Sequence, residues 1–209
     1  MRCAQRATDL NVVLDQSGSM SAADDLKARA FVKELAGAFQ VGPGAGDSRL
    51  SLVAFSTAVT STSPFSKPAA TDALTFSQYV DALKQVPTST GTSLALFAAA
   101  AQFASAPPVS GRSARTASVI ISDGQPNQGG RCKQAVAGKP MSANALVCAR
   151  AAFDELRGQA DVIVLVRIAR TSNSIRPDVF GDQEDLDIPT TAGALLDVVA
   201  NVLGAVCAE

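Results

Sequence analysis

The chain has 209 residues, 47% of them hydrophobic and 18% charged, and its mean hydropathy of +0.18 is typical of a protein that folds around a large apolar core. Eighteen basic and nineteen acidic residues give a net charge of −1, which argues against a dedicated nucleic-acid surface. The sequence contains no histidine, so hydrolases with Ser-His or Cys-His centres and most zinc hydrolases are excluded. No run approaches 18 apolar residues, so we expect no membrane insertion.

Short apolar, β-branched runs alternate along the chain with longer segments of helical periodicity. In chain order, the patterns predict a strand at 9–15, a helix at 22–40, a strand at 49–56, a short antiparallel edge strand at 58–65, helices at 71–86 and 92–106, a strand at 116–122, a helix within 142–160 that ends near Gly158, strands at 161–169 and 185–189, and a helix at 190–206. The side chains expected to face the core include Leu26, Leu74, Val86 and Leu196.

This alternation predicts an α/β fold: a doubly wound, mostly parallel central sheet with one short antiparallel edge strand and helices on both faces. The sequence contains no internal repeat and no long low-complexity linker. We therefore expect residues 1–209 to form one domain.

Polar motifs stand where two of the predicted strands end and where one helix begins. Asp15-Gln16-Ser17-Gly18-Ser19 follows the first strand, Gly91-Thr92 opens the alanine-rich helix, and Ser122-Asp123-Gly124 follows the strand at 116–122. In an open α/β sheet, ligands bind beyond the carboxyl ends of the strands. Each motif offers oxygen ligands and none offers nitrogen or sulfur, which favours a hard cation such as Mg²⁺.

The first motif has a second interpretation. Taken alone, D-x-S-x-S is more typical of a helix N-cap, in which Ser17 or Ser19 accepts backbone N–H groups. An EF-hand is excluded, because the twelfth position of a calcium loop that starts at Asp15 is Leu26 and not an acid. The metal interpretation rests on the three motifs occurring together.

These motifs resemble a known family. D-Q-S-G-S-M, the later G-T-S and the S-D-G after an apolar strand are similar to the metal-ion-dependent adhesion site of the von Willebrand factor type A (integrin I-like) domain. The resemblance covers essentially the whole chain. It implies that Ser17, Ser19 and Thr92 contact Mg²⁺ or Mn²⁺ directly, that Asp15 and Asp123 act partly through water, and that an acidic residue of the partner completes the coordination. Gln16, Gln125 and Asn127 are expected at the rim of the ligand site.

The four cysteines are even in number and contain no C-x-x-C pair, which predicts two disulfides and an oxidising compartment. Cys3 and Cys207, one near each end, resemble the pattern of the von Willebrand and thrombospondin-related gliding-adhesin members of the family. Cys132 and Cys148 would then close a loop beside the metal face. Free buried thiols are the alternative for this second pair.

The resemblance implies a monomeric, extracellular or cell-surface adhesion module that is not an enzyme. It is expected to bind a protein or matrix ligand through a cation that bridges to a ligand carboxylate, and acidic glycans are a second candidate ligand. The alternatives are an intracellular scaffold domain of an ATP-driven complex and a Mg²⁺-dependent phosphoryl-transfer enzyme. The second is disfavoured because the three motifs contain no Lys or Arg to hold phosphate and offer no general base.

Overall fold

The computed structural model describes residues 7–123, 145–168 and 186–208. Its elements are β1 (Thr8–Asp15), α1 (Ala22–Gly37), β2 (Arg49–Phe55), β3 (Val59–Ser63), η1 (Pro68–Thr71), α2 (Ala73–Asp81), α3 (Thr92–Ala104), β4 (Arg115–Ser122), α4 (Ala145–Arg157), β5 (Val162–Ile168), β6 (Leu186–Thr190), η3 (Ala192–Val198) and α6 (Val199–Cys207). No helix in these described ranges is long and apolar enough to cross a membrane.

One sheet of six strands forms the centre of the molecule, in the order β3-β2-β1-β4-β5-β6. Every neighbouring pair is parallel except β2 and β3, which pair antiparallel at one edge. The predicted doubly wound sheet with one antiparallel edge strand is therefore confirmed. The chain leaves β1 toward β2 and later crosses to β4 on the other side, so the strand order reverses at β1.

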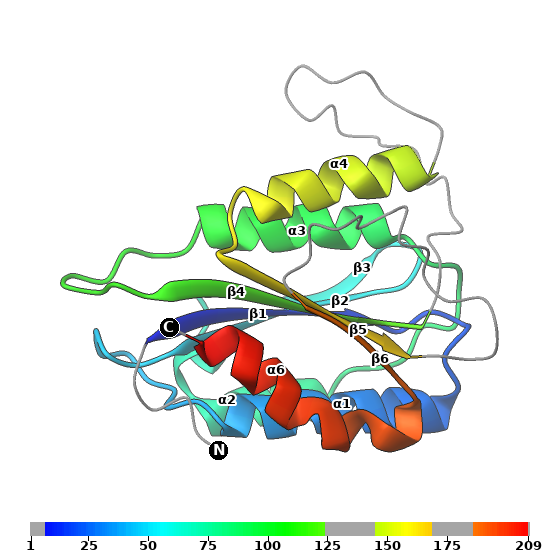
Figure 1. Cartoon of the computed structure of the whole chain (residues 1–209), viewed down its shortest axis with the longest axis horizontal. Coiled ribbons are helices and arrows are strands. Elements are labelled where there is room, and N and C mark those ends of the chain that lie inside the picture. Colours follow the sequence, from blue (N-terminus) through cyan, green and yellow to red (C-terminus); the bar gives the residue numbers. More distant parts are fainter. Residues whose placement is uncertain (1–6, 124–144, 169–185, 209) are drawn as a thin grey trace.

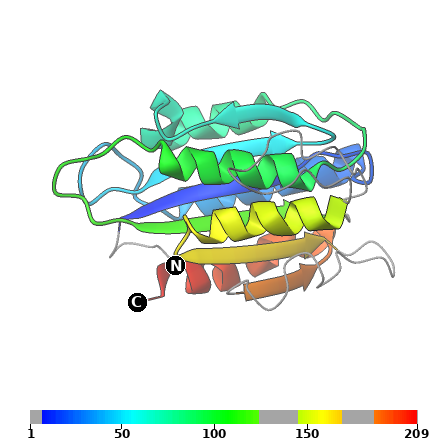
Figure 2. The same ribbon diagram turned by 90° about the horizontal axis from the view of Figure 1, so that it is seen from above.

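Helices cover both faces of the sheet, and a separate apolar core lies under each layer. Figure 1 shows α3 and α4 on one face and α1, α2 and α6 on the other, and Figure 2 shows α3 and α4 side by side above the strands. The core under α3 and α4 contains Phe55, Leu96 and Phe153, and the opposite core contains Phe31 and Phe76. Both apolar faces of the sheet are thus buried, as a parallel sheet requires.

Several side chains that the periodicity placed in the core are exposed instead. Leu74 is 67% exposed, and Leu26, Val86 and Leu196 also lie at the surface. Helix α2 ends at Asp81, five residues before the predicted end at 86, so Val86 belongs to the following loop. The expected last helix begins as the tighter helix η3, which rotates Leu195 inward and leaves Leu196 outside.

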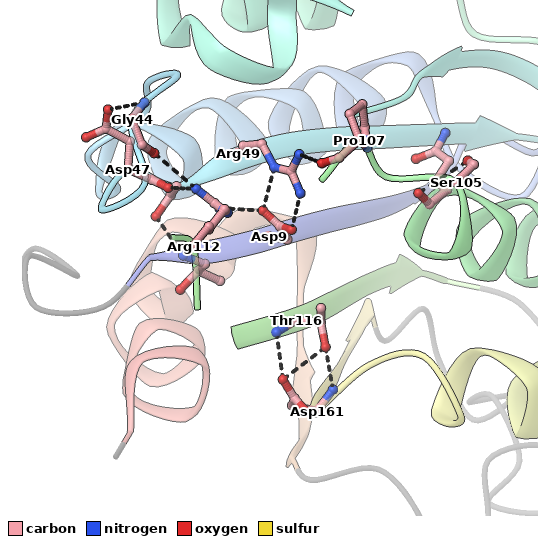
Figure 3. Close-up of polar contacts among 12 residues, drawn as sticks. Asp9, Gly44, Asp47, Arg49, Ser105, Pro107, Arg112, Thr116 and Asp161 are labelled. Atoms are coloured by element: carbon pink, nitrogen blue, oxygen red, sulfur yellow. Dashed lines mark hydrogen bonds and ion pairs between the residues drawn. The ribbon is translucent and has the colours of Figure 1, made fainter. Parts of the chain in front are cut away.

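The amino ends of the neighbouring strands β1 and β2 are joined by a buried charge cluster (Figure 3). Arg49 donates from Nε and Nη2 to both carboxylate oxygens of Asp9, at 2.9 and 2.5 Å, and Arg112 Nη2 donates to Asp9 Oδ1 at 2.5 Å. Arg49 Nη1 also donates to Pro107 O and Arg112 Nη1 to Asp47 O, whereas the buried Arg112 Nε has no hydrogen-bond partner among the described residues. The cluster joins three segments at the edge opposite the predicted site.

Candidate metal centre

The first motif forms the loop that leaves the carboxyl end of β1. Asp15 is fully buried, and its Oδ1 accepts a hydrogen bond from the Ser17 backbone N–H at 2.8 Å. This bond closes a tight turn, and the Ser17 and Ser19 hydroxyls lie 2.8 Å apart. The alternation of Asp15, Ser17 and Ser19 therefore brings their oxygens together on one side of the loop, as the D-x-S-x-S spacing predicted.

The third motif meets the first across the strand pair β1 and β4. Ser122 Oγ donates to Asp15 Oδ2 at 2.5 Å, and Ser19 Oγ donates to Asp123 Oδ1 at 2.6 Å. Parallel pairing brings the two strand ends to the same edge, so residues more than 100 positions apart in sequence come into contact. Ser122 belongs to the third motif, but the sequence gives no sign of its role, which is to orient the Asp15 carboxylate.

The second motif is held at the same edge by β2. Gly91 N donates to Ser56 O at 2.6 Å, and Gln16 N donates to Phe55 O at 2.7 Å, so both loops are anchored to the carboxyl end of one strand. Thr92 is buried at the first position of α3, and its Oγ1 has no hydrogen-bond partner among the described residues. A buried hydroxyl without a protein partner costs stability unless another group binds it.

The capping interpretation of the first motif is wrong. The N-cap of α1 is Ser21, whose Oγ accepts from Asp24 N at 3.1 Å. Ser17 and Ser19 precede the helix and bond to each other and to Asp123 instead. At the start of α3, Gly91 is the N-cap and no side chain caps the helix. The hydroxyls of the three motifs are therefore not used for helix capping.

The expected rim residues have different positions. Gln16 is fully buried, and its Nε2 donates to Asp25 Oδ1 in α1 at 3.0 Å, so its side chain points into the protein and away from any ligand rim. The side chains of Asp15 and Ser17 face the candidate site, and the Gln16 side chain between them points the opposite way, toward α1. Gln125 and Asn127 lie outside the described residues.

Burial controls the electrostatics of the centre. Loss of hydration raises the pKa of Asp15 from 3.8 to about 6, opposed by the hydrogen bonds from Ser122 and Ser17, and the nearby Asp123 charge raises it further. In the part of the chain that the structure describes, no three His, Cys, Asp or Glu side chains group to hold a metal. A cation here would be bound by hydroxyls and only two carboxylates, a donor set that suits a hard divalent ion.

The two described cysteines, Cys148 in α4 and Cys207 at the end of α6, are both disulfide-bonded. Cys3 and Cys132 lie outside the described residues. The predicted pairing of Cys3 with Cys207 and of Cys132 with Cys148 stays a prediction.

The fold is a doubly wound α/β domain. Its converging hydroxyl and carboxylate oxygens lie at the carboxyl ends of β1 and β4, where the strand order reverses. The family model of the von Willebrand factor type A domain matches residues 9–185, and the chain belongs to that family. A comparison with curated protein sequences found no significant match.

Solved structures share the fold at low sequence identity. Proximal thread matrix protein 1 from the mussel byssus is 16% identical with a TM-score of 0.72, and the match covers 98% of this chain and 49% of that one. A structure of the same mussel protein with a zinc-occupied metal-ion-dependent adhesion site motif has 17% identity and a TM-score of 0.70, covering 99% and 47%. The PilB minor pilin from Streptococcus sanguinis has 13% identity and a TM-score of 0.64, covering 95% and 60%. The chain spans about half the length of the mussel protein chain.

Proposed function

We propose that the centre binds a divalent cation, Mg²⁺ or Mn²⁺, as the fixed part of a ligand-binding site. The observation that carries the proposal is the convergence of the Ser17, Ser19 and Asp123 oxygens together with the buried Thr92 hydroxyl, for which the described residues offer no hydrogen-bond partner. The residues that would hold the ion are Asp15, Ser17, Ser19, Thr92 and Asp123. When bound, the ion supplies a positive centre that attracts an external carboxylate.

The donor chemistry favours Mg²⁺ and Mn²⁺, because hydroxyl and carboxylate oxygens are hard ligands. Zinc occupies the corresponding kind of motif in one mussel byssus structure, so zinc is the ion to compare. Asp15 Oδ1 accepts a hydrogen bond from the Ser17 N–H and Oδ2 accepts one from Ser122 Oγ. These two bonds orient the carboxylate before an ion binds.

The low formal charge of the site supports a role in binding an acidic partner. Among the described residues, Asp15 and Asp123 are the only ones that would contribute carboxylates, so a bound dication would not be over-neutralised and would retain affinity for a Glu or Asp of another molecule. We propose that the ligand is a protein or matrix component with an exposed acidic residue, and that the domain is not an enzyme. Acidic glycans are the second ligand class to test.

The disulfide-bonded state of Cys148 and Cys207 supports a location outside the cell, because disulfides persist in oxidising compartments. We propose that the domain is displayed there as a monomer. Peptide mapping of the unreduced protein tests the predicted pairs: the Cys3–Cys207 and Cys132–Cys148 linkages are expected. Four free thiols would instead favour the intracellular scaffold.

The test of metal binding is calorimetric titration of Mg²⁺, Mn²⁺ and Zn²⁺ into chelator-stripped protein, with Asp123→Ala and Thr92→Val as site variants. Both variants are expected to weaken Mg²⁺ and Mn²⁺ binding by about tenfold or more. Thr92→Val keeps the shape of the side chain and removes a hydroxyl that has no hydrogen-bond partner in the described part of the chain, so the metal-free fold should be at least as stable as the wild type.

A matched control is Thr116→Val. The Thr116 hydroxyl is bonded to Asp161 Oδ2 at 3.0 Å at the opposite end of β4, so this variant is expected to lose stability and retain metal affinity. A folded wild type that binds none of these ions, also in the presence of acetate as a model carboxylate, would overturn the proposal. Binding that Thr92→Val and Asp123→Ala leave unchanged would place the ion elsewhere.

A further inference from the structure

The loop between α2 and α3 lies directly against the backbone of the first motif. Gln85 Nε2 donates to Met20 O at 2.7 Å and to Ser17 O at 3.5 Å, and Gly18 N donates to Thr88 O at 2.7 Å. The fit leaves little space, since a Cβ on Gly18 would lie 3.1 Å from the backbone carbon of Pro87. The conformation of residues 17–20 is therefore shaped by a segment about 70 positions further along the chain.

Side chains of α1 extend this contact to the end of α2, which lies on the same face of the sheet. Gln16 Nε2 donates to Asp25 Oδ1 at 3.0 Å, and the other oxygen of Asp25 lies 2.8 Å from Arg29 Nη2. Arg29 Nη1 then donates to Leu83 O at 3.0 Å, just beyond the end of α2. Asp25 is 1% exposed, so this ion pair is largely shielded from solvent and from screening by salt.

The contacts form a path that starts at Gln16 and ends at Met20, and the backbone of residues 16–20 closes it into a ring. It runs from Gln16 through the ion pair to the Leu83 carbonyl, along the chain to Gln85, and back to the Met20 carbonyl. We call the four side chains on this path the positioning ring: Gln16, Asp25, Arg29 and Gln85.

We propose that the positioning ring holds the first motif in its metal-binding shape before the ion binds. This inference rests on the proposed function. The ring side chains that reach the loop act on its backbone: Gln85 bonds to the carbonyls of residues 17 and 20, and Gln16 anchors the position between Asp15 and Ser17.

The physical reason is the cost of ordering a loop. A loop that is already held pays little entropy when its oxygens converge on an ion, whereas an unsupported loop must be ordered at the expense of its binding free energy. Groups that orient metal ligands typically contribute 10–100-fold to metal affinity. A ring that only stabilised the fold would change the melting temperature and leave metal affinity unchanged, and this difference separates the two roles.

The experiment compares two ring variants with one matched control. Gln85→Met and Gln16→Met keep the length of the side chain, add no charge and remove the donor at two different points of the ring. The control is Lys33→Gln. This change breaks the exposed ion pair between Lys33 Nζ in α1 and Asp81 Oδ1 in α2, which are 2.6 Å apart and lie away from the loop.

The dissociation constant for Mn²⁺ is measured by calorimetry, together with amide hydrogen exchange of residues 17–20 with and without Mn²⁺. We expect the dissociation constant to rise about tenfold in both ring variants and to stay unchanged in Lys33→Gln. Exchange at residues 17–20 should be faster in the metal-free ring variants and return to the wild-type rate with saturating Mn²⁺.

The outcomes separate the two proposals. If the wild type binds Mn²⁺ and both folded ring variants bind it with the affinity of Lys33→Gln, the positioning role is overturned while the metal site stands. If the wild type binds no cation, the proposed function is wrong and this inference falls with it. Gln85 is only half-buried, so its variant provides a folded test even where Gln16→Met does not fold.

Discussion

At the scale of single residues, Asp15 combines complete burial with hydrogen bonds that favour its charged form. Ser122 and the Ser17 N–H stabilise the carboxylate, yet desolvation outweighs them and raises its pKa to about 6. The metal-free centre therefore holds a carboxylate in an environment that disfavours the charge. A bound cation reverses this balance, because a dication is the largest local charge in such a site.

The pH dependence of the metal-free protein follows from Asp15. Its pKa is raised in the folded state, so its contribution to stability is fully present below about pH 4 and is lost as the pH rises through about 6. The rise of the Asp15 pKa from 3.8 to about 6 corresponds to a loss of about 3 kcal/mol in the free energy of unfolding across this pH range. Asp15→Asn, which does not titrate, should remove this loss.

Urea unfolding in the presence of chelator, at about pH 4 and about pH 8, measures the effect. The free energy of unfolding of the wild type should fall relative to that of Asp15→Asn between the two pH values. Parallel pH profiles of the two proteins would show that the pKa of Asp15 is the same in the folded and unfolded states, which would contradict the expected rise.

At the scale of elements, α3 joins the sheet to the candidate metal centre. Its buried side is formed largely by small side chains such as Ala95 and Ala99, which let the helix lie close to the strands. Gly91, immediately before the helix, lies so close to the turn between β2 and β3 that a Cβ would be 2.2 Å from Thr57 O. The start of α3, and with it Thr92, is therefore positioned by contact of backbone against backbone.

Gly91→Ala is expected to weaken both folding and metal binding. The added methyl would collide with the Thr57 backbone carbonyl in the turn after β2, so we expect the start of α3 to shift and carry Thr92 with it. Gly204→Ala in α6 is the matched control: a Cβ added at Gly204 would meet no tertiary neighbour within 4 Å, and the change should stabilise the helix by about 0.5–1 kcal/mol.

Thermal unfolding with chelator and Mn²⁺ titration report the two effects separately. A Gly91→Ala protein with wild-type melting temperature and wild-type Mn²⁺ affinity would contradict the close approach seen between Gly91 and Thr57.

At the scale of the whole molecule, the candidate metal centre lies at the carboxyl ends of the strands and the Asp9 charge cluster lies at their amino ends. The first and last described residues lie near the cluster: Arg115 N donates to Ala7 O at 3.0 Å, and its guanidinium donates to the Ala208 carbonyl. Both described ends of the chain are therefore at the edge away from the site (Figure 1).

The separation of the two edges predicts that stability and metal affinity respond independently. Asp9→Asn leaves Arg49 and Arg112 buried without their shared counter-charge and should cost about 3–5 kcal/mol of folding free energy. The Mn²⁺ dissociation constant of the folded fraction should be unchanged, because the cluster contacts none of the metal-site residues. Chemical unfolding and calorimetry test both statements, and a parallel loss of metal affinity would indicate coupling across the sheet.

The amino-acid sequence by itself determined the class of fold and which polar side chains of the three motifs were expected to gather at the candidate site. Alternating periodicities placed the strands and helices close to their observed positions, since strand and helix patterns are written in consecutive residues. Asp15, Ser17, Ser19 and Asp123 were expected to meet because the carboxyl ends of parallel strands share one edge, and the hydrogen bonds among them confirm it.

Only the tertiary structure decided how the centre is supported. The cap of α1 is Ser21 rather than Ser17 or Ser19, Gln16 points into the protein rather than to the rim, and Gln85 contacts the first motif from another loop. These facts depend on which crossover brings residues 82–91 beside residues 16–20. Local sequence carries no signal for that contact, because a buried glutamine that supports a loop and a solvated one have the same neighbours in the chain.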